Sequence, residues 1–311
     1  MKRALVGYTG FVGSNLYASG GYDGAYNSKN IEQAFGTKPD LLIYSGLRAE
    51  KYLANNDPER DLKMIENAEE NIRKIDPKKL VLISSVDVFK DPNGKDEDSE
   101  LDTEGLQPYG VNRCIFERWV RNNYPDALIV RLPGLFGKNI KKNFIYDMIN
   151  YIPFMLKADK FAELSEKEPV LKDYYQLQDN GFYKAAVPDE EKKMLRGVFE
   201  RLGFSALNFT DSRNRYQFYD LSRLNDDINI ALENNITLWH PATEPVSAGE
   251  VYRYITGREF LNELNGEPVN YDFRTKYAEL FGGRDGYLCG KEEVLRAVKT
   301  FVEENKEKGN V

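Results

Sequence analysis

Short apolar runs alternate with amphipathic segments along the first 140 residues of the chain. Each run is only a few residues long and almost wholly apolar, which is typical of strands buried on both faces of a sheet. The segments between them repeat apolar residues at helical spacing, and Asp57-Pro58 and Pro108 are typical helix starts. This alternation predicts a doubly wound parallel sheet with helices on both faces. The predicted strands are 3–6, 23–26, 41–44, 80–83 and 127–132.

The pattern changes after residue 137. Residues 138–204 are predicted to be mostly helical and are rich in Lys, Glu, Tyr and Phe. A strand at 216–219 is expected to return to the sheet, and another is expected at 236–240. We therefore predict an α/β protein with a smaller, mostly helical second lobe. The predicted dinucleotide-binding domain is 1–137 plus about 214–240, and the predicted substrate lobe is about 138–213 and 241–311.

Composition narrows the functional classes. A net charge of −7 argues against a general binder of nucleic acid or of anionic membranes. No signal peptide and no apolar stretch long enough to span a membrane are evident, so we expect a cytoplasmic protein. Two cysteines, Cys114 and Cys289, predict no disulfide framework, and Cys114 fits a helix core better than a nucleophile. The single histidine, His240, predicts no metal site.

Three glycines follow the first predicted strand. Gly7 allows a sharp turn off the strand, Gly10 allows backbone N–H groups to approach a pyrophosphate, and Gly13 allows close packing of the helix that follows. The amino terminus of that helix supplies unpaired N–H groups for phosphates. Tight strand–helix turns use glycine for structural reasons too, but the position at the start of the chain favours a nucleotide site.

The ends of the second and third strands carry further candidates. Asn27, Ser28 and Lys29 stand where a carboxylate would select NAD by contacting the adenosine ribose, and their neutral and basic groups favour NADP over NAD. They could equally be polar loop residues. The segment 45–47 follows the third strand at the ligand-binding edge of a parallel sheet. Its residues are Ser45, Gly46 and Leu47.

A third group of residues fits hydride-transfer chemistry. Such a site needs an acid/base for a hydroxyl proton, a donor to the developing oxyanion and a nearby cation. Tyr109 and Arg113 share a helix face because they are four residues apart, and Ser85 ends a strand at the same edge. Ser84 and Asp87 are secondary candidates. Tyr109 could instead be a core aromatic, and Arg113 a member of a structural ion pair.

The glycine spacing, filled by Tyr8, Thr9, Phe11 and Val12, resembles the extended short-chain dehydrogenase/reductase superfamily of nucleotide-sugar epimerases, dehydratases and reductases. Ser85 stands in a similar Ser-x-x-Val-Phe element, and residues 131–137 resemble the turn that lies near the nicotinamide. The resemblance implies a Rossmann-type fold, Tyr109 as general acid/base and Ser85 as the partner of the substrate hydroxyl.

The sequence departs from the superfamily pattern at Arg113, where the family has lysine, and at Gly134, where asparagine is common. Arginine keeps the charge but is a wider, planar fork. Residues and resemblance together predict the following cofactor contacts: Gly7, Thr9, Gly10, Phe11, Val12, Gly13, Asn27, Ser28, Lys29, Ser45, Gly46, Leu47, Ser84, Tyr109, Arg113, Pro133 and Gly134.

The substrate is predicted to be a sugar, and a nucleotide-linked sugar is favoured because basic residues could grip a diphosphate. Solvated lysines are the simpler alternative, and Arg274 only loosely replaces the arginine element with which epimerases hold the nucleotide. The candidate substrate contacts are Asp87, Lys142, Asn143, Arg215 and Arg274.

The leading hypothesis is an NAD(P)-dependent sugar oxidoreductase or epimerase. A dinucleotide-binding sensor or partner subunit with little catalysis is the alternative that Arg113 and the missing nucleotide clamp favour. A reductase of small non-sugar carbonyls is a third. A homodimer is compatible with all three.

Overall fold

The computed structural model describes residues 1–308, and the chain forms two compact units. The first comprises residues 1–140, 215–246 and 270–294, and the second comprises the described residues of 141–214, 247–269 and 295–308. The predicted division placed 241–311 wholly in the second lobe. The structure instead returns 270–294 to the first unit, where Phe273 packs with Val86 and Ala242.

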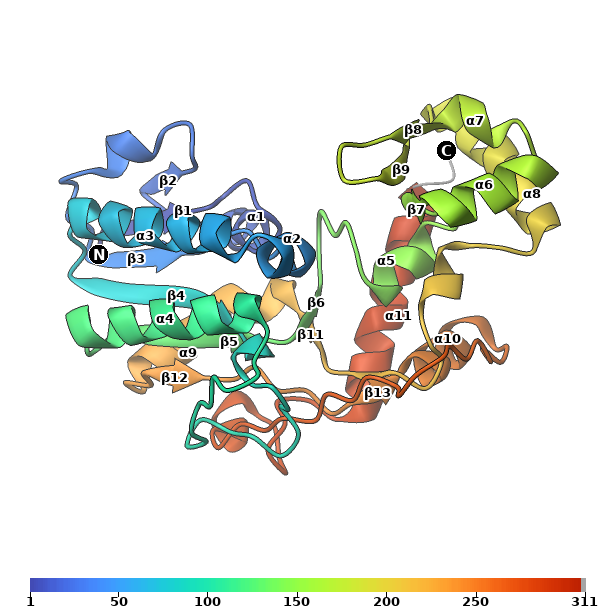
Figure 1. Cartoon of the computed structure of the whole chain (residues 1–311). Coiled ribbons are helices and arrows are strands. Elements are labelled where there is room, and N and C mark those ends of the chain that lie inside the picture. The colour runs from blue at the N-terminus through green and yellow to red at the C-terminus, as the bar shows by residue number, and fades with distance from the viewer. Residues whose placement is uncertain (309–311) are drawn as a thin grey trace. The chain divides into compact units, whose positions relative to one another are not determined.

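The first unit is built on a six-stranded parallel sheet with the order β12-β5-β4-β3-β1-β2 (Figure 1). Each strand of this sheet runs parallel to the strands beside it. The chain leaves β1 for β2 on one side and then returns to β3 on the other, so the strand order reverses at β1 and β3. Ligands of open parallel sheets bind at the carboxyl ends of strands at such a point. The sheet strands are β1 (Arg3–Val6), β2 (Gly24–Tyr26), β3 (Leu41–Tyr44), β4 (Lys79–Ser85), β5 (Leu128–Leu132) and β12 (Leu238–Trp239).

Two apolar layers cover the sheet, which confirms the predicted doubly wound Rossmann-type fold. On one face, Ile65 and Ile72 of α3 (Pro58–Ile75) and Phe116 of α4 (Pro108–Asn123) pack on the strands. On the other, Leu16 of α1 (Phe11–Ala18) and Ile228 of α9 (Leu224–Glu233) do so. Alternate residues of each buried strand supply the two layers, because side chains point to opposite faces in turn.

Helix α3 begins as its sequence predicts but buries one unexpected residue. The Asp57 carboxylate accepts a hydrogen bond from the Arg60 N–H at 3.1 Å, and Pro58 occupies the first turn. Leu62, which the apolar pattern placed in the core, is half-buried, whereas Asp61 is buried. A buried carboxylate requires a partner, and that partner lies in the candidate site.

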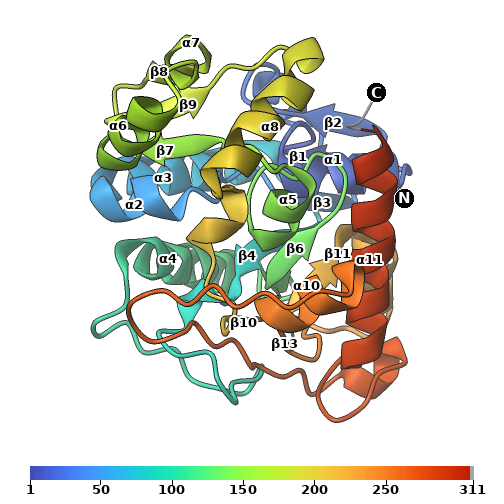
Figure 2. The same cartoon turned by 90° about the vertical axis from the view of Figure 1, so that its right-hand side faces the viewer.

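The second unit combines helices with a three-stranded antiparallel sheet of the order β7-β9-β8 (Figure 2). The prediction of a mostly helical segment missed these strands, which are only three or four residues long. Their apolar side chains join those of α6, α7 and α8 in one cluster. The elements are α5 (Phe144–Ile149), β7 (Met155–Lys157), α6 (Ala158–Lys167), α7 (Leu171–Tyr174), β8 (Tyr175–Leu177), β9 (Phe182–Ala185), α8 (Lys192–Leu202) and α10 (Ala248–Thr256).

The strand expected at 216–219 does not join the main sheet. The structure splits it into two short strands, of which β11 pairs in parallel with β6 in a small sheet of its own. None of the helices within residues 1–308 combines the length and the apolar character that crossing a bilayer requires. The remaining elements are α2 (Lys51–Asn56), β6 (Gly134–Phe136), β10 (Arg215–Tyr216), β11 (Phe218–Asp220), β13 (Val246–Ser247) and α11 (Lys291–Lys308), with 3₁₀ turns η1 (Ile31–Ala34), η2 (Val86–Val88), η3 (Asp189–Glu191), η4 (Ala206–Phe209), η5 (Leu221–Arg223) and η6 (Ala278–Phe281).

Candidate active site

The glycine turn joins β1 to α1 at the point where the strand order reverses. Gly7 adopts a φ of +94°, and a Cβ there would lie 2.5 Å from the Ser45 carbonyl oxygen. A Cβ at Gly13 would lie 2.0 Å from the Gly7 carbonyl oxygen, so only glycine lets α1 pack this closely on the turn. The Ser45 hydroxyl donates to the Val6 carbonyl at 2.9 Å and thereby ties the ends of β1 and β3 together.

Gly10 differs from the other two glycines because it is exposed and is the N-cap of α1. Its φ of −78° is open to any residue, so the glycine is not required by the backbone conformation. An exposed N-cap without a side chain, ahead of an eight-residue helix, is the cradle that a pyrophosphate needs. Phe11 and Val12 pack half-buried on the core below, and Thr9 is exposed beside Gly10. The residues of this turn therefore fit a dinucleotide.

The turn after β2 lies beside the glycine turn, because the Gly7 N–H donates to the Tyr26 carbonyl at 2.7 Å. The side chain of Asn27 shapes this turn by accepting from the Lys29 N–H at 2.9 Å. Ser28 and Lys29 are exposed. The structure therefore leaves these two side chains accessible for the predicted ribose contact and uses the Asn27 oxygen for the fold.

Close packing at Gly110 brings Tyr109 to the turn that carries Ser85 and Asp87. A Cβ at Gly110 would lie 2.3 Å from the Asp87 carbonyl oxygen, so α4 touches the backbone of η2 directly. The Ser85 hydroxyl donates to the Asp87 carboxylate at 2.9 Å. Tyr109 is buried one residue before this contact. The three predicted residues thus gather at the carboxyl end of β4, and their catalytic roles stay predictions.

Arg113 extends from α4 into the interface between α3 and α4. Its guanidinium donates to both oxygens of Asp61, at 3.0 and 3.4 Å, and to the Arg48 carbonyl at 3.2 Å. Both side chains of the pair are almost fully buried, with exposed fractions of 5% and 2%. The guanidinium stacks on the Tyr109 ring, 4.5 Å from its centroid. Arg113 therefore contacts the face of Tyr109, and its hydrogen bonds go to the fold.

The structure adds two residues that the sequence analysis missed, Lys51 and Tyr271. The Lys51 ammonium pairs with the Asp87 carboxylate at 2.6 Å, and the Tyr271 hydroxyl donates to the other Asp87 oxygen at 3.3 Å. Lys51 also interacts electrostatically with Tyr109. Lys51 lies 36 residues before Asp87 and Tyr271 184 residues after it, so no local motif could have linked them.

Ser84, a predicted cofactor contact, turns its hydroxyl into the core. It donates to the Glu117 carboxylate at 2.6 Å, and Glu117 forms a buried ion pair with Arg131 at 2.7 Å. Arg131 also donates to the His240 ring at 3.3 Å, so the other ring nitrogen carries the proton and donates to the Arg274 carbonyl at 3.2 Å. Burial, with the Arg131 charge, lowers the pKa of His240 to about 3. This buried network joins β4, α4 and β5 in the core of the first unit.

The remaining predicted contacts are divided between the two units. In the first unit, Gly134 begins β6, where a Cβ would lie 2.8 Å from the Gln217 carbonyl oxygen, so the close approach of the backbone favours glycine here. Arg274 is paired with Asp272, whereas Arg215 is exposed on β10.

In the second unit, Asn143 caps α5 by accepting from the Ile145 N–H at 3.0 Å, and Lys142 precedes it. Pro133, just before β6, and Gly46 and Leu47, just after β3, keep their predicted places at the carboxyl edge of the sheet.

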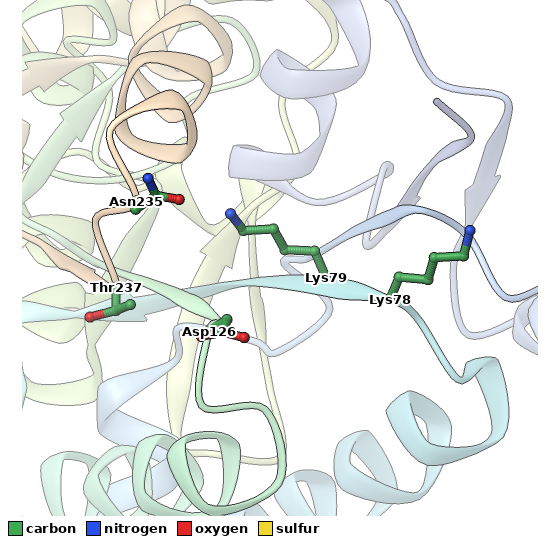
Figure 3. Close-up of a pocket in the computed structure, with 5 residues that line it drawn as sticks. All are labelled: Lys78, Lys79, Asp126, Asn235 and Thr237. Atoms are coloured by element: carbon green, nitrogen blue, oxygen red, sulfur yellow. The ribbon is translucent and has the colours of Figure 1, made fainter.

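A separate hollow of about 380 Å³ lies at the opposite edge of the sheet (Figure 3). Its residues stand at the amino ends of β4, β5 and β12, away from the edge that gathers Gly10, Ser85 and Asp87. Parallel sheets bind their ligands at the carboxyl edge. The lining residues are Lys78, Lys79, Asp126, Asn235 and Thr237.

Comparisons with known proteins support the same reading of the fold. Residues 22–171 match the model of the NAD dependent epimerase/dehydratase family, starting just after the glycine turn. No curated protein sequence matches the chain. The dTDP-4-dehydrorhamnose reductase of Bacillus anthracis str. Ames, solved in complex with NADP, is 17% identical, with 98% of this chain and 99% of that chain covered and a TM-score of 0.63.

Two further solved structures of this fold are of enzymes with other activities. A UDP-galactose 4-epimerase is 14% identical over 99% of each chain, with a TM-score of 0.63. An NAD dependent NDP-hexosamine 5,6-dehydratase is 13% identical over 98% of each chain, with a TM-score of 0.61. At these identities the likeness establishes the fold. The family match over residues 22–171 agrees with the expected resemblance to NAD-dependent epimerases and dehydratases.

Proposed function

We propose that this chain binds NADP or NAD and moves a hydride between the nicotinamide and a carbon of a sugar, as an oxidoreductase or epimerase. A nucleotide-linked sugar is the substrate class we favour. The observation that carries the proposal is the meeting of two features at one sheet edge. The exposed glycine N-cap of α1 follows β1, and the Ser85, Asp87 and Tyr109 cluster follows β4.

In this proposal each group of residues has a separate role. The α1 terminus at Gly10 holds the pyrophosphate through backbone N–H groups, and Ser28 and Lys29 meet the adenosine ribose. The bound nicotinamide accepts or gives the hydride. Tyr109 takes the hydroxyl proton from the sugar when the alcohol is oxidised and returns it on reduction. Ser85, whose hydroxyl donates to Asp87 in this structure, turns that donor to the same sugar oxygen as its charge develops.

NADP is favoured over NAD, because no carboxylate stands at the end of β2 to repel a 2′-phosphate. Ser28 is exposed there, so Ser28→Asp should not disturb the core. We expect the unmodified protein to bind NADP at least as tightly as NAD, and the variant to prefer NAD. Calorimetric titration with both cofactors measures this, and a strong NAD preference before mutation would contradict it.

A second function, a dinucleotide sensor with little catalysis, has one observation in its favour. Arg113 stands at the position where the resemblance predicts a lysine. Its guanidinium donates hydrogen bonds to Asp61 and to the Arg48 carbonyl. If no other cation serves Tyr109, proton transfer would be weak. This alternative predicts cofactor binding at the same site without turnover.

One experiment separates the two functions. The protein is incubated with NADPH or NADH, or the oxidised forms, and a panel of nucleotide sugars, and hydride transfer is followed by nicotinamide absorbance and product analysis. We expect turnover that falls by about 100-fold or more in Tyr109→Phe, the scale of a lost general acid/base. Cofactor binding without turnover on any sugar would favour the sensor.

The cofactor site is tested by Gly10→Ala. The added Cβ would lie 3.3 Å from the Gly7 carbonyl oxygen, so the fold can absorb it with a small shift. We expect cofactor affinity to fall at least tenfold with little change in thermal stability, because the methyl group faces the phosphate cradle. Gly13→Val is unsuitable, because its Cβ would meet the turn at 2.0 Å. Unchanged cofactor affinity in folded Gly10→Ala would contradict the proposed site.

A further inference from the structure

We propose that Lys51 of α2, held by Asp87, is the solvent-accessible positive charge that acts on Tyr109, whereas the buried Arg113 guanidinium lies over the Tyr109 ring and gives its hydrogen bonds to the fold. Lys51 is then a positioning residue that acts through the ionisation of Tyr109. The inference rests on the proposed function in one respect only, because Tyr109 matters to turnover if the chain transfers hydride. The charge relation between Lys51 and Tyr109 can be measured without any turnover.

The first support is the anchoring of α2 to the helix of Tyr109. The Asn55 side-chain oxygen accepts a hydrogen bond from the Tyr109 backbone N–H at 2.9 Å. Asn55 thus caps the start of α4, where backbone N–H groups need a partner. Lys51 lies four residues before Asn55, on the same face of α2. The contact that fixes Asn55 to the Tyr109 backbone therefore keeps this face of α2 against the start of α4.

The second support is the set of charged and polar groups that surround the Lys51 ammonium. Asp87 of η2 pairs with it at 2.6 Å, and the Ser85 and Tyr271 hydroxyls hold the same carboxylate at 2.9 and 3.3 Å. Burial alone would lower the pKa of Lys51, but the charge of Asp87 and the tyrosines Tyr271 and Tyr109 outweigh it, and the pKa is raised. Lys51 is therefore a cation at neutral pH.

The third support is that the two cations near Tyr109 differ in solvent exposure and in hydrogen bonding. Arg113 is buried, and two of its guanidinium nitrogens donate to Asp61 and to the Arg48 carbonyl. The Lys51 side chain is 50% exposed, so a ligand at the sheet edge can reach it. A flexible ammonium near a tyrosine hydroxyl stabilises the tyrosinate, because opposite charges within a few ångströms favour the charged form.

The test measures the ionisation of Tyr109 directly. Protein labelled with ¹³C at tyrosine Cζ is titrated with base by NMR, and the Tyr109 signal is assigned by its loss in Tyr109→Phe. In Lys51→Met we expect the midpoint of Tyr109 ionisation to rise by about one pH unit, a tenfold change in the ionisation constant. Lys51→Arg keeps the charge and should stay close to the unmodified protein. Lys63→Met removes an exposed lysine of α3 and is the matched control.

Turnover is measured on the same variants. We expect Lys51→Met to lower the rate about tenfold at neutral pH and to move the alkaline limb of the rate profile upward, with Lys51→Arg restoring both. An unchanged Tyr109 midpoint in Lys51→Met, or an equal shift in Lys63→Met, overturns the inference even if the protein turns over. A shifted midpoint in a protein that never transfers hydride supports the Lys51 assignment and refutes the proposed function instead.

Discussion

Two cation–carboxylate pairs flank Tyr109, and they differ mainly in burial. The Arg113–Asp61 pair lies between α3 and α4 with exposed fractions of 5% and 2%, whereas Lys51 and Asp87 of the other pair are 50% and 18% exposed. The first pair makes its contacts within the helix interface, including an Asn112 amide that donates to Asp61 at 3.0 Å. The second shares its carboxylate with two hydroxyls at the ligand edge.

The comparison shows that the position of a residue in a motif does not determine what its side chain does. Arg113 stands where the resemblance predicts a cation for the site, but its guanidinium pairs with Asp61 in the fold. A buried carboxylate without a partner would be costly, so Asp61 and Arg113 depend on each other. Lys51 stands outside the motif and remains near water, where a charge can still respond to a ligand.

The largest expected effect is on stability, from breaking the buried pair. Arg113→Met leaves Asp61 buried without its cation, so we expect the free energy of unfolding to fall by about 3–5 kcal/mol. Urea unfolding measures this. The double variant Asp61→Leu/Arg113→Met should regain most of the loss, because no buried charge is left unpaired. Lys38→Met, from the exposed pair with Asp76, is the control and should leave the free energy of unfolding nearly unchanged. Equal costs for both single variants would remove the contrast between the pairs.

The next effect concerns pH, in the buried network beneath the site. The folded pKa of His240 is about 3, below its usual value of 6.5, so the unfolded chain binds a proton that the folded chain excludes. The stabilisation is present above pH 6.5 and is lost as the pH falls towards 3, at about 1.4 kcal/mol per pH unit. His240→Asn keeps a donor for the Arg274 carbonyl but cannot titrate.

Urea unfolding between pH 6 and pH 4 therefore should show a steeper loss of stability in the unmodified protein than in His240→Asn. The difference between the two slopes isolates the histidine from the carboxylates that also titrate in this range. Parallel slopes would mean that His240 can take up a proton in the fold.

The smallest expected effect is the stability change in Lys51→Met. Half-exposed ion pairs contribute little to folding, because water screens the charges and the side chains lose freedom when they pair. We expect the free energy of unfolding to change by less than about 1 kcal/mol, measured by the same urea method. A loss as large as that of Arg113→Met would place Lys51 in the fold and would erase the distinction between the two pairs.

Much of the first unit was predictable from local sequence. Buried strands of parallel sheets read as apolar runs, so the main sheet strands up to β5 were expected within two residues of their ends. The cap at Asp57 and the turn at Gly7 were predictable because both depend on a few adjacent residues. The short strands of the second unit were missed, because three or four residues carry too little pattern to separate a strand from a helix.

The sequence by itself determined the doubly wound sheet, the glycine turn at its switch point and the gathering of Ser85 and Tyr109 at one edge. Only the tertiary structure decided which partner each charged group takes. Asp61 and Arg113 are 52 residues apart. Glu97, in the loop between β4 and α4, is buried and accepts from the His240 and Lys276 N–H groups at 2.8 and 2.9 Å. Periodicity and turn chemistry act between neighbours along the chain, whereas charge pairing depends on distance in space and on burial, which exist only once the chain has folded.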